Sequence, residues 1–357
     1  MWHFALIHAR TGLPINDLVT ATGRQVKFAL NEPTEMQFTI PGRSEAALAI
    51  GTLITDVYVA WNDLLLARLR VGTVSDDLDA NDHEMSVAAV DYQGLLDRRY
   101  AHQAIQYTNQ DLTYIAWDLI DYTQRRYNAP GGDWGITRGL QATTGSVTHL
   151  VEDGKKIGEA IADVRGLYPE FDYEIDAAKR FNVWQMRGSL RDFALEYGGN
   201  VSRIRRSIDP NNYANLVRQS GADGIAPARR MVGDLATRTE GRIEAQEGNT
   251  DLHNATVVGW AADAYLQRHS ALLPAYEITL SPGAGWDPTK LWLGDQAWIV
   301  VRSGRLDAVT LERVRTITID VGDNGQTDVT IGFGDFQENL LALVRGTPAR
   351  LEQMNRR

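Results

Sequence analysis

Apolar and polar residues alternate most regularly between residues 291 and 333. A short apolar run at 297–301 is followed by two alternating segments, whose apolar positions are Ile317, Ile319, Val321, Val329, Ile331 and Phe333. Alternation with a period of two is typical of an antiparallel strand that buries one face. The pattern therefore predicts three consecutive strands in this part of the chain.

The turn between the last two strands follows from the same alternation. A two-residue loop at the Asn-Gly pair would set apolar residues opposite polar ones, because it pairs odd positions with even ones. A three-residue loop over 323–325, closed by a left-handed glycine, puts both apolar rows on one face. The predicted opposite pairs are Ile319 with Val329 and Ile317 with Ile331.

The N-terminal part of the chain contains a second copy of this outline. Gly51 and Arg70 are 19 residues apart, as are Gly294 and Arg313, and each glycine and each arginine comes just before or at the start of a predicted strand. After each arginine the sequence passes through an acidic loop into a further alternating segment. We interpret the two stretches as an internal repeat.

The remaining strands and helices are predicted from the same periodicities. Strands are expected at 2–8, within 25–40, at 53–61, 64–75 and 87–92, and again at 276–280. A period of 3.6 begins after Asn109 or Asp111, either of which could cap a helix, and its apolar stripe is Leu112, Ile115, Ala116, Leu119 and Ile120. A shorter helix near 155–167 and a hairpin with arms FDYEID and RFNVWQM complete an α/β insertion.

The second β unit is expected to begin after residues 197–199. The segments NVSRIRRSID and NYANLVRQSG are predicted to be strands around a turn at 209–211. A mostly polar stretch at 228–251 and a helix near 252–268 are expected to interrupt this unit. The C-terminal residues suggest a helix broken at 346–348, with a basic end.

Composition describes an ordinary globular protein. The chain has 357 residues, 43% of them hydrophobic, and no cysteine, so disulfides, thiolate metal sites and cysteine nucleophiles are excluded. No segment approaches the length of a membrane span, and the N-terminus does not look like a secretory signal. The net charge of −10 disfavours stable non-specific binding to DNA, because that binding depends on cations.

The sequence contains no strong catalytic motif. The seven histidines have no HExxH spacing, and there is neither a GxSxG elbow nor a phosphate-binding glycine loop. Asp77, Asp79 and Asn81 have calcium-loop spacing, but Asp82 stands where the turn needs glycine. Glu170 and Asp172 could form the carboxylate pair of a glycosidase. No cofactor and no metal are expected.

Several short segments together resemble one protein family, the tail hub or baseplate hub proteins of long-tailed bacteriophages, which include siphophage minor tail proteins. The segments are LLDRRY at 95–100, YGGN at 197–200, NLVRQSG at 215–221, LGD at 293–295 and RVRTITIDVGDNGQTDVTIGFG at 313–334. They occur in the family's order over nearly the whole chain. The long polar interruption of the second unit departs from the family pattern.

The resemblance implies an α+β, β-rich fold, with two tail-tube-like β-barrel or sandwich domains and an α/β insertion between them. The expected domains are 1–104 (first tube-like domain), 105–196 (insertion), 197–345 (second tube-like domain, interrupted at about 228–270) and 346–357 (tail). Three chains would then form a homotrimeric, pseudo-hexameric ring, which accounts for the repeat.

The implied function is structural. Such a hub is expected in the virion, at the tail tip, after synthesis in the host cytoplasm. Its expected partners are the distal tail protein, the tape measure protein and tail tip or fibre proteins, and DNA is expected to pass through it without stable binding. The candidate channel residues are the acidic ones of the two equivalent loops: Asp76, Asp77, Asp79, Asp82, Glu84, Asp320, Asp323 and Asp328. Two alternatives stay open, a cell-wall-degrading glycosidase or peptidase of the tail and a receptor- or carbohydrate-binding tail module.

Overall fold

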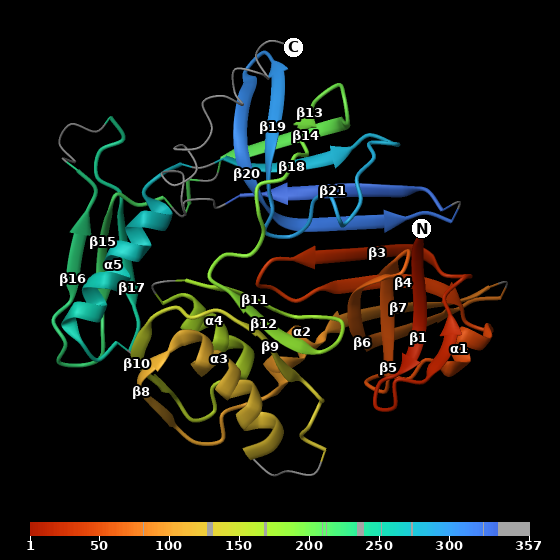
Figure 1. Ribbon diagram of the computed structural model, residues 1–357, viewed down its shortest axis with the longest axis horizontal. Helices are drawn as coiled ribbons and strands as arrows, with labels where there is room; N and C mark the ends of the chain where they lie inside the picture. Colours follow the sequence, from red (N-terminus) through yellow and green to blue (C-terminus); the bar gives the residue numbers. More distant parts are fainter. Residues whose placement is uncertain are drawn as a thin grey trace. The chain divides into compact units, whose positions relative to one another are not determined.

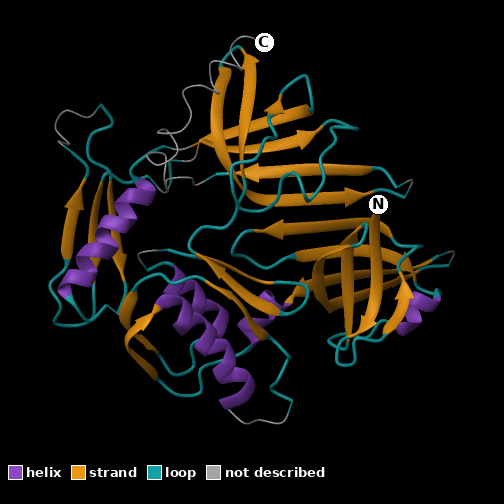
Figure 2. Ribbon diagram, in the orientation of Figure 1, coloured by secondary structure: helices purple, strands orange, loops and turns teal. Residues whose placement is uncertain are grey.

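The computed structural model describes residues 1–80, 82–126, 131–167, 170–208, 210–211, 213–233, 239–250, 252–272, 274–323 and 325–334. It contains two compact units (Figures 1 and 2). The first is formed by Met1–Arg206 with Tyr276–Phe333, and the second is built around Ser207–Ala275. The predicted C-terminal helix and the tail at 346–357 lie outside the described residues.

A large, mostly antiparallel sheet dominates the first unit. Its main path runs in the order β14-β18-β21-β20-β3-β4-β7-β6-β5-β1-β2, with β19 and β13 attached to β20 off this path (Figure 1). The strands are β1 (Trp2–His8), β2 (Pro14–Asp17), β3 (Thr22–Ala29), β4 (Glu35–Pro41), β5 (Thr55–Trp61), β6 (Leu64–Leu78), β7 (His83–Asp91), β13 (Leu195–Glu196), β14 (Val201–Ile208), β18 (Pro274–Leu280), β19 (Gln296–Ser303), β20 (Leu306–Val321) and β21 (Thr327–Phe333). One short helix, α1 (Glu45–Ala49), is capped by the Ser44 hydroxyl.

The two repeated stretches form matching meanders, β5-β6-β7 and β19-β20-β21. Residues of β6 and β20 that hold equivalent positions differ by 243 in number. Arg70 of β6, for example, is the counterpart of Arg313 of β20. Val74 lies opposite Val87 in the first meander, and the counterpart pair in the second is Ile317 opposite Ile331. Even the bulges agree, because the register shifts between Val71 and Thr73 in β6 and between Val314 and Thr316 in β20. The two meanders therefore share strand order, and the β6–β7 and β20–β21 pairs also share register and bulge. The first hairpins differ, because β5–β6 has a register shift between Val59 and Ala60 and β19–β20 has none.

The predicted hairpin at the end of β20 is confirmed in register. Ile319 lies opposite Val329, and Ile317 opposite Ile331. The amide of Gly322 donates to the carbonyl of Gln326 at 2.9 Å, and Gly325 is left-handed with φ of +77°. Asn324, the middle residue of the predicted loop, lies outside the described residues. Alternation alone was sufficient to fix this pairing because a slip by one residue would turn the apolar row away from the core.

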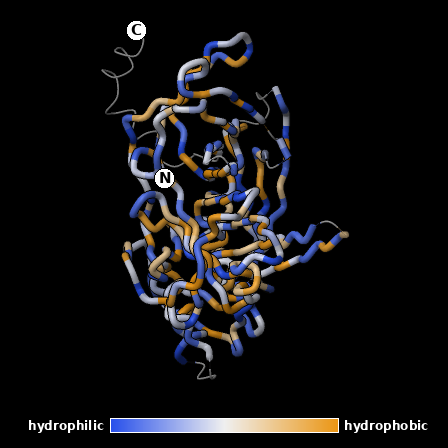
Figure 3. The backbone as a smooth tube through the Cα atoms, turned by 90° about the vertical axis from the view of Figure 1, so that its right-hand side faces the viewer, coloured by the Kyte–Doolittle hydropathy of each residue, from blue (hydrophilic) through white to orange (hydrophobic). Residues whose placement is uncertain are grey.

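A single junction joins the two meanders within the sheet. β3 pairs with β4 on one edge and with the C-terminal half of β20 on the other, from Thr316 opposite Ala29 to Val321 opposite Arg24. Buried side chains from both halves form one continuous apolar cluster on one face of the sheet. The alternation of apolar and polar residues along the strands is visible in Figure 3.

The insertion forms a separate apolar core between helices and two small sheets. Its elements are α2 (Tyr92–Leu95), η1 (Leu96–Arg98), β8 (Ile105–Asp111), α3 (Leu112–Asp121), η2 (Tyr122–Arg126), β9 (Thr137–Gln141), β10 (Ser146–Val151), α4 (Ile157–Arg165), β11 (Asp172–Ile175) and β12 (Arg180–Trp184). The predicted helix is confirmed as α3, whose N-cap is Asp111 and whose five stripe residues are all buried. The second predicted helix is α4, and the predicted hairpin is β11 with β12.

The second unit corrects the prediction for residues 201–251. The segments predicted as strands around one turn are strands, but β14 belongs to the large sheet and β15 (Leu216–Ser220) to another. The polar stretch is not merely an interruption, since it contributes β16 (Ala228–Met231) and β17 (Glu244–Gly248), which flank β15. The helix α5 (Ala255–His269) packs on this sheet through Ala262 and Leu266. Polar strands are stable here because the helix supplies the apolar face that they lack.

Candidate functional site

The face of the large sheet opposite the core is polar across both meanders. Cross-strand registers place its residues side by side from β6 to β21, through the β3–β20 junction. These residues are Thr73, Ser75, Asp77, Glu84, Ser86, Ala88, Glu35, Gln37, Thr39, Gln25, Lys27, Thr316, Thr318, Asp320, Asp328, Thr330 and Gly332. Most carry short hydroxyl, amide or carboxylate groups. We call this set the polar face.

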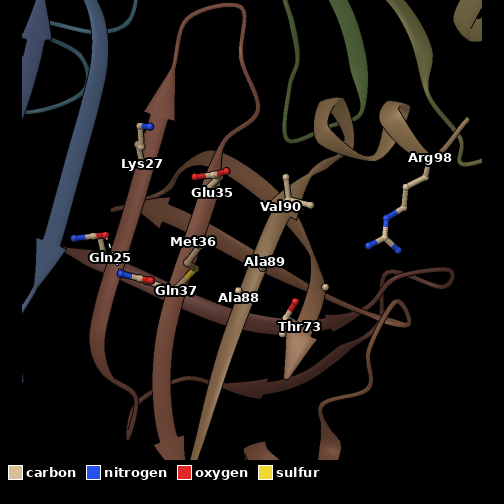
Figure 4. Close-up of a pocket in the computed structure, with 11 residues that line it drawn as sticks. Gln25, Lys27, Glu35, Met36, Gln37, Thr73, Ala88, Ala89, Val90 and Arg98 are labelled. Atoms are coloured by element: carbon tan, nitrogen blue, oxygen red, sulfur yellow. Dashed lines mark hydrogen bonds between the residues drawn. The ribbon is translucent and has the colours of Figure 1, made fainter. Parts of the chain in front are cut away.

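A shallow hollow of about 380 Å³ lies on the polar face between β3, β4, β7 and β6 (Figure 4). Small residues, Gly72 and Ala88 among them, leave the space open. The Gln37 amide donates to Gln25 Oε1 at 2.9 Å, and the Gln25 amide donates to Asp320 at 2.6 Å. This chain of amides crosses the junction and links β4 and β3 to β20 of the second meander.

The predicted acidic loops lie at equivalent ends of the two meanders. Asp77 lies directly opposite Glu84, and Asp320 lies directly opposite Asp328. Each position in one pair is the counterpart of a position in the other. Like charges opposite one another on neighbouring strands are destabilising, so the chain accepts an energetic cost at the same place twice.

The other four predicted residues are arranged differently. Asp76 lies on the opposite face from Asp77 and forms an ion pair with His83 at 3.1 Å when that histidine is protonated. Asp79 and Asp82 stabilise the β6–β7 loop itself, since the Asp82 amide donates to Asp79 Oδ1 at 2.7 Å. Asp323 is exposed in the β20–β21 turn. The structure therefore brings together two acidic pairs rather than one cluster of eight.

Two arginines at the repeat positions, the buried Arg313 and the partly buried Arg70, attach the insertion to the sheet, and the sequence alone did not indicate this role. Arg313 of β20 forms an ion pair with Asp172 of β11 and donates to the Gly294 carbonyl at 3.0 Å and to the Arg187 carbonyl at 2.8 Å. Burial acts to raise the pKa of Asp172, but Arg313 together with the Asn31 and Arg187 hydrogen bonds outweighs it and holds that pKa below its usual range.

The counterpart arginine of the first meander has a similar environment. Arg70 donates to Asp56, to the Tyr92 hydroxyl and to the Leu53 carbonyl. Burial, with the nearby Asp56 carboxylate, raises the pKa of Tyr92 above its usual value. The signal that could have identified both sites is the repeat itself, because a long cation at the same position of two half-buried strands needs a partner.

The carboxylates considered for glycosidase chemistry are engaged elsewhere. Asp172 is buried against Arg313, and Glu170 lies 3.6 Å from the Arg165 guanidinium. Neither lines the hollow. Within the described part of the chain, no three histidine or carboxylate side chains are grouped closely enough to hold a metal ion. No helix in the described ranges is long and apolar enough to cross a membrane.

Comparison with solved structures gives a consistent likeness. A tail protein from Neisseria meningitidis MC58 aligns with a TM-score of 0.67 and 12% identity, over 94% of this chain and 98% of that one. The chain has the fold of phage tail proteins. The 43 kDa tail protein of prophage MuSo2 from Shewanella oneidensis also aligns with a TM-score of 0.67, at 14% identity and with the same coverage.

A more distant likeness extends to a secretion system. An E. coli protein described as a component of the type VI secretion system, with structural similarity to the T4 tail proteins gp27 and gp5, aligns with a TM-score of 0.50 and 13% identity. The alignment covers 89% of this chain and 74% of that one. No protein-family model matches the sequence, and no curated protein matches it. The β-rich tail-protein fold expected from the sequence is thus confirmed by structure.

Proposed function

We propose that this chain is a structural tail hub protein, which acts by assembly and not by catalysis. Three copies form a pseudo-hexameric ring that joins the tail tube and distal tail ring to the tip proteins. The observation that carries this proposal is the repeated meander in one sheet, in which the β6–β7 and β20–β21 pairs have the same register and the same bulge. A chain with two equivalent halves can occupy two positions of a six-fold arrangement, so three chains complete it.

The polar face is proposed to line the channel of this ring. Lys27 is the one cation in the set of residues that defines the polar face, most of the others carry short hydroxyl, amide or carboxylate groups, and two acidic pairs repel the phosphates of a nucleic acid. DNA and the tape measure protein would therefore pass without being held. The cost of placing Asp77 opposite Glu84, and Asp320 opposite Asp328, then has a functional reason.

The proposed domains follow the expected division, with tube-like domains at 1–104 and 197–345 and the insertion at 105–196. The second tube-like domain is interrupted by the compact unit around Ser207–Ala275, which is longer than the expected interruption at about 228–270. The expected partners are the distal tail protein, the tape measure protein and the tip or fibre proteins. The insertion is attached through the buried Arg313–Asp172 pair, which would hold it in a fixed position while the tip assembles.

The ring and its channel can be tested together by labelled electron microscopy. The natural chain has no cysteine, so Ser86→Cys introduces a unique thiol on the polar face, and Glu45→Cys introduces one on helix α1 as the control. Class averages should show rings of three chains, with a maleimide-gold label inside the ring for Ser86→Cys and outside for Glu45→Cys. Gold on the outer wall for both variants would overturn the channel assignment. A hexamer of chains would overturn the two-positions-per-chain assignment.

The enzyme alternative is separated by a second measurement. The assembled protein should leave purified peptidoglycan intact, with no fall in turbidity and no release of reducing sugars or free amines. Release of either product by the purified wild-type chain would contradict the structural assignment.

A further inference from the structure

The two meanders differ in one respect, which is the neighbour beside the long strand. The C-terminal half of β20 lies between β21 and β3. The corresponding half of β6, Thr73–Leu78, pairs with β7 on one edge, and none of the described strands lies along its other edge. The repeat thus contains a filled junction in one meander and an open one in the other.

At the end of β20, two side chains are buried where β3 lies beside that strand, and their counterparts in β6 are exposed. Val321, at the end of β20, is 5% exposed, whereas its counterpart Leu78, at the end of β6, is 64% exposed. Ile319 is buried, whereas its counterpart Asp76 is exposed. An open strand edge presents unpaired N–H and C=O groups, to which another strand can add.

The strand that would fill the open junction is present at the other end of the sheet. β3 pairs with β4, which pairs with β7, and in the same way β14 pairs with β18, which pairs with β21. β14 therefore holds the place in the second half that β3 holds in the first. It is the terminal strand of the path, and no described strand lies along its outer edge.

The charges of the two open edges are complementary. β14 carries Arg203 and Arg205, both exposed. The open half of β6 carries Asp76 and Asp77, with Glu84 opposite Asp77. The filled junction has the same polarity, because Lys27 and Arg24 of β3 lie beside the β20 segment that carries Asp320.

We propose that the open half of β6 in one copy pairs, antiparallel and edge to edge, with β14 of a second copy of this chain. This rests on the proposed ring and names the surface through which its copies join. Each chain offers one β6 edge and one β14 edge, so the contact is head-to-tail and closes after three copies. The junction between chains then repeats the β3–β20 junction within a chain.

Disulfide trapping tests the pairing, since every thiol in the experiment is introduced. Ser75→Cys is combined in turn with a cysteine at Ser202, Arg203, Ile204 or Arg205, because the register along β14 is to be found by the scan. The matched control is Thr318→Cys with Lys27→Cys, at the filled junction. Thr318 is the counterpart of Ser75 and lies directly opposite Lys27, so this pair should close within one chain on oxidation.

At millimolar protein, at least one double variant should oxidise to a ladder that ends at a covalent trimer. Ser75→Cys alone should give no covalent dimer, because β6 does not meet β6 in a head-to-tail ring. Trimers seen by light scattering, with no crosslink from any double variant although the control pair closes, would overturn the edge pairing and leave the ring standing. A chain that stays monomeric at this concentration, with no crosslink, would overturn both. Dimers of the Ser75→Cys single variant would overturn the head-to-tail arrangement.

A charge exchange gives a second readout that needs no thiol. Asp77→Arg should weaken self-association roughly tenfold by placing like charges together, and Asp77→Arg with Arg205→Asp should restore it. Self-association is measured by light scattering over a concentration series. Equal weakening by the single and the double variant would count against contact between these edges.

Discussion

Replacement of Arg313 by methionine is expected to destabilise the first unit by about 3–5 kcal/mol at neutral pH, the cost of leaving one member of a buried ion pair alone. The guanidinium now donates to Gly294, Arg187 and the Asp172 carboxylate. After the replacement, Asp172 retains the Asn31 amide at 2.8 Å and the Arg187 amide at 2.6 Å, but no cation in direct contact. Methionine fills a similar volume, so the loss is electrostatic rather than a cavity.

The pH dependence should distinguish this explanation from a packing defect. In the wild type the pKa of Asp172 lies below its unfolded value near 3.8, so its contribution is present above about pH 4 and is lost as the pH falls through the folded pKa. Without Arg313, burial should raise the folded pKa above the unfolded one. The variant then takes up a proton on folding, and its stability falls as the pH rises from about 4. The difference in the free energy of unfolding between wild type and variant should therefore increase from acid to neutral pH.

Urea unfolding followed by tryptophan fluorescence, at several pH values, measures this difference in unfolding free energy. Two further variants serve as a rescue and a control. Asp172→Asn combined with Arg313→Met should recover more than half of the loss, because no buried charge remains. Arg180→Met, which removes an exposed ion pair with Asp176, should cost less than about 1 kcal/mol. A loss at Arg313→Met that is below 1 kcal/mol, or that does not change with pH, would refute the reasoning.

Three further predictions concern other parts of the first unit. Burial raises the pKa of Asp91 to about 6, so its contribution to stability should decline as the pH rises from about 4 to 6, and Asp91→Asn should remove that slope from the unfolding free energy. Gly294→Ala should lower the urea midpoint much more than Gly304→Ala, since both glycines are left-handed but a Cβ at Gly294 would lie 2.6 Å from a backbone carbonyl whereas one at Gly304 meets open space. Glu84→Gln and Asp328→Asn should each stabilise the chain slightly, by roughly 0.2–1 kcal/mol, by relieving a like-charge pair, and destabilisation by both in thermal melts would show that the acidic pairs carry no cost.

Much of the fold could be predicted because it is encoded locally. The β20–β21 register follows from alternation, and α3 follows from its stripe and from the Asp111 cap. The repeat was visible because two pairs of residues, a glycine and an arginine in each, kept the same spacing while the residues between them changed. These features need only neighbours in sequence, and a single chain shows them directly.

The rest depends on contacts between distant segments. Nothing near Thr316 indicates that β3, almost 300 residues earlier, lies beside it. The sequence did not reveal that β14 and β15 belong to different sheets. A Pro-Asn turn between two alternating segments is typical of a β-hairpin, in which the two strands would pair with each other. The strands β16 and β17 were missed because their residues are mostly exposed, and the apolar partner that makes them stable is α5, which follows both in the chain.

The charges on the two open edges bear on which assemblies the chain can form. An unprotected edge can pair with any other, so an open β6 could join a second β6 and lead to open-ended association. Asp76 and Asp77 oppose that pairing, since two such edges would place four carboxylates together, and Arg203 and Arg205 oppose the pairing of β14 with β14 in the same way. Of the three pairings of these two edges, the proposed pairing of β6 with β14 is the one that would bring opposite charges together. That contact would be heterologous, and a heterologous contact must either propagate or close. In the proposed ring the contact between chains would copy the β3–β20 junction. Each successive half would then be turned by the same rotation, as six positions filled by three chains would require.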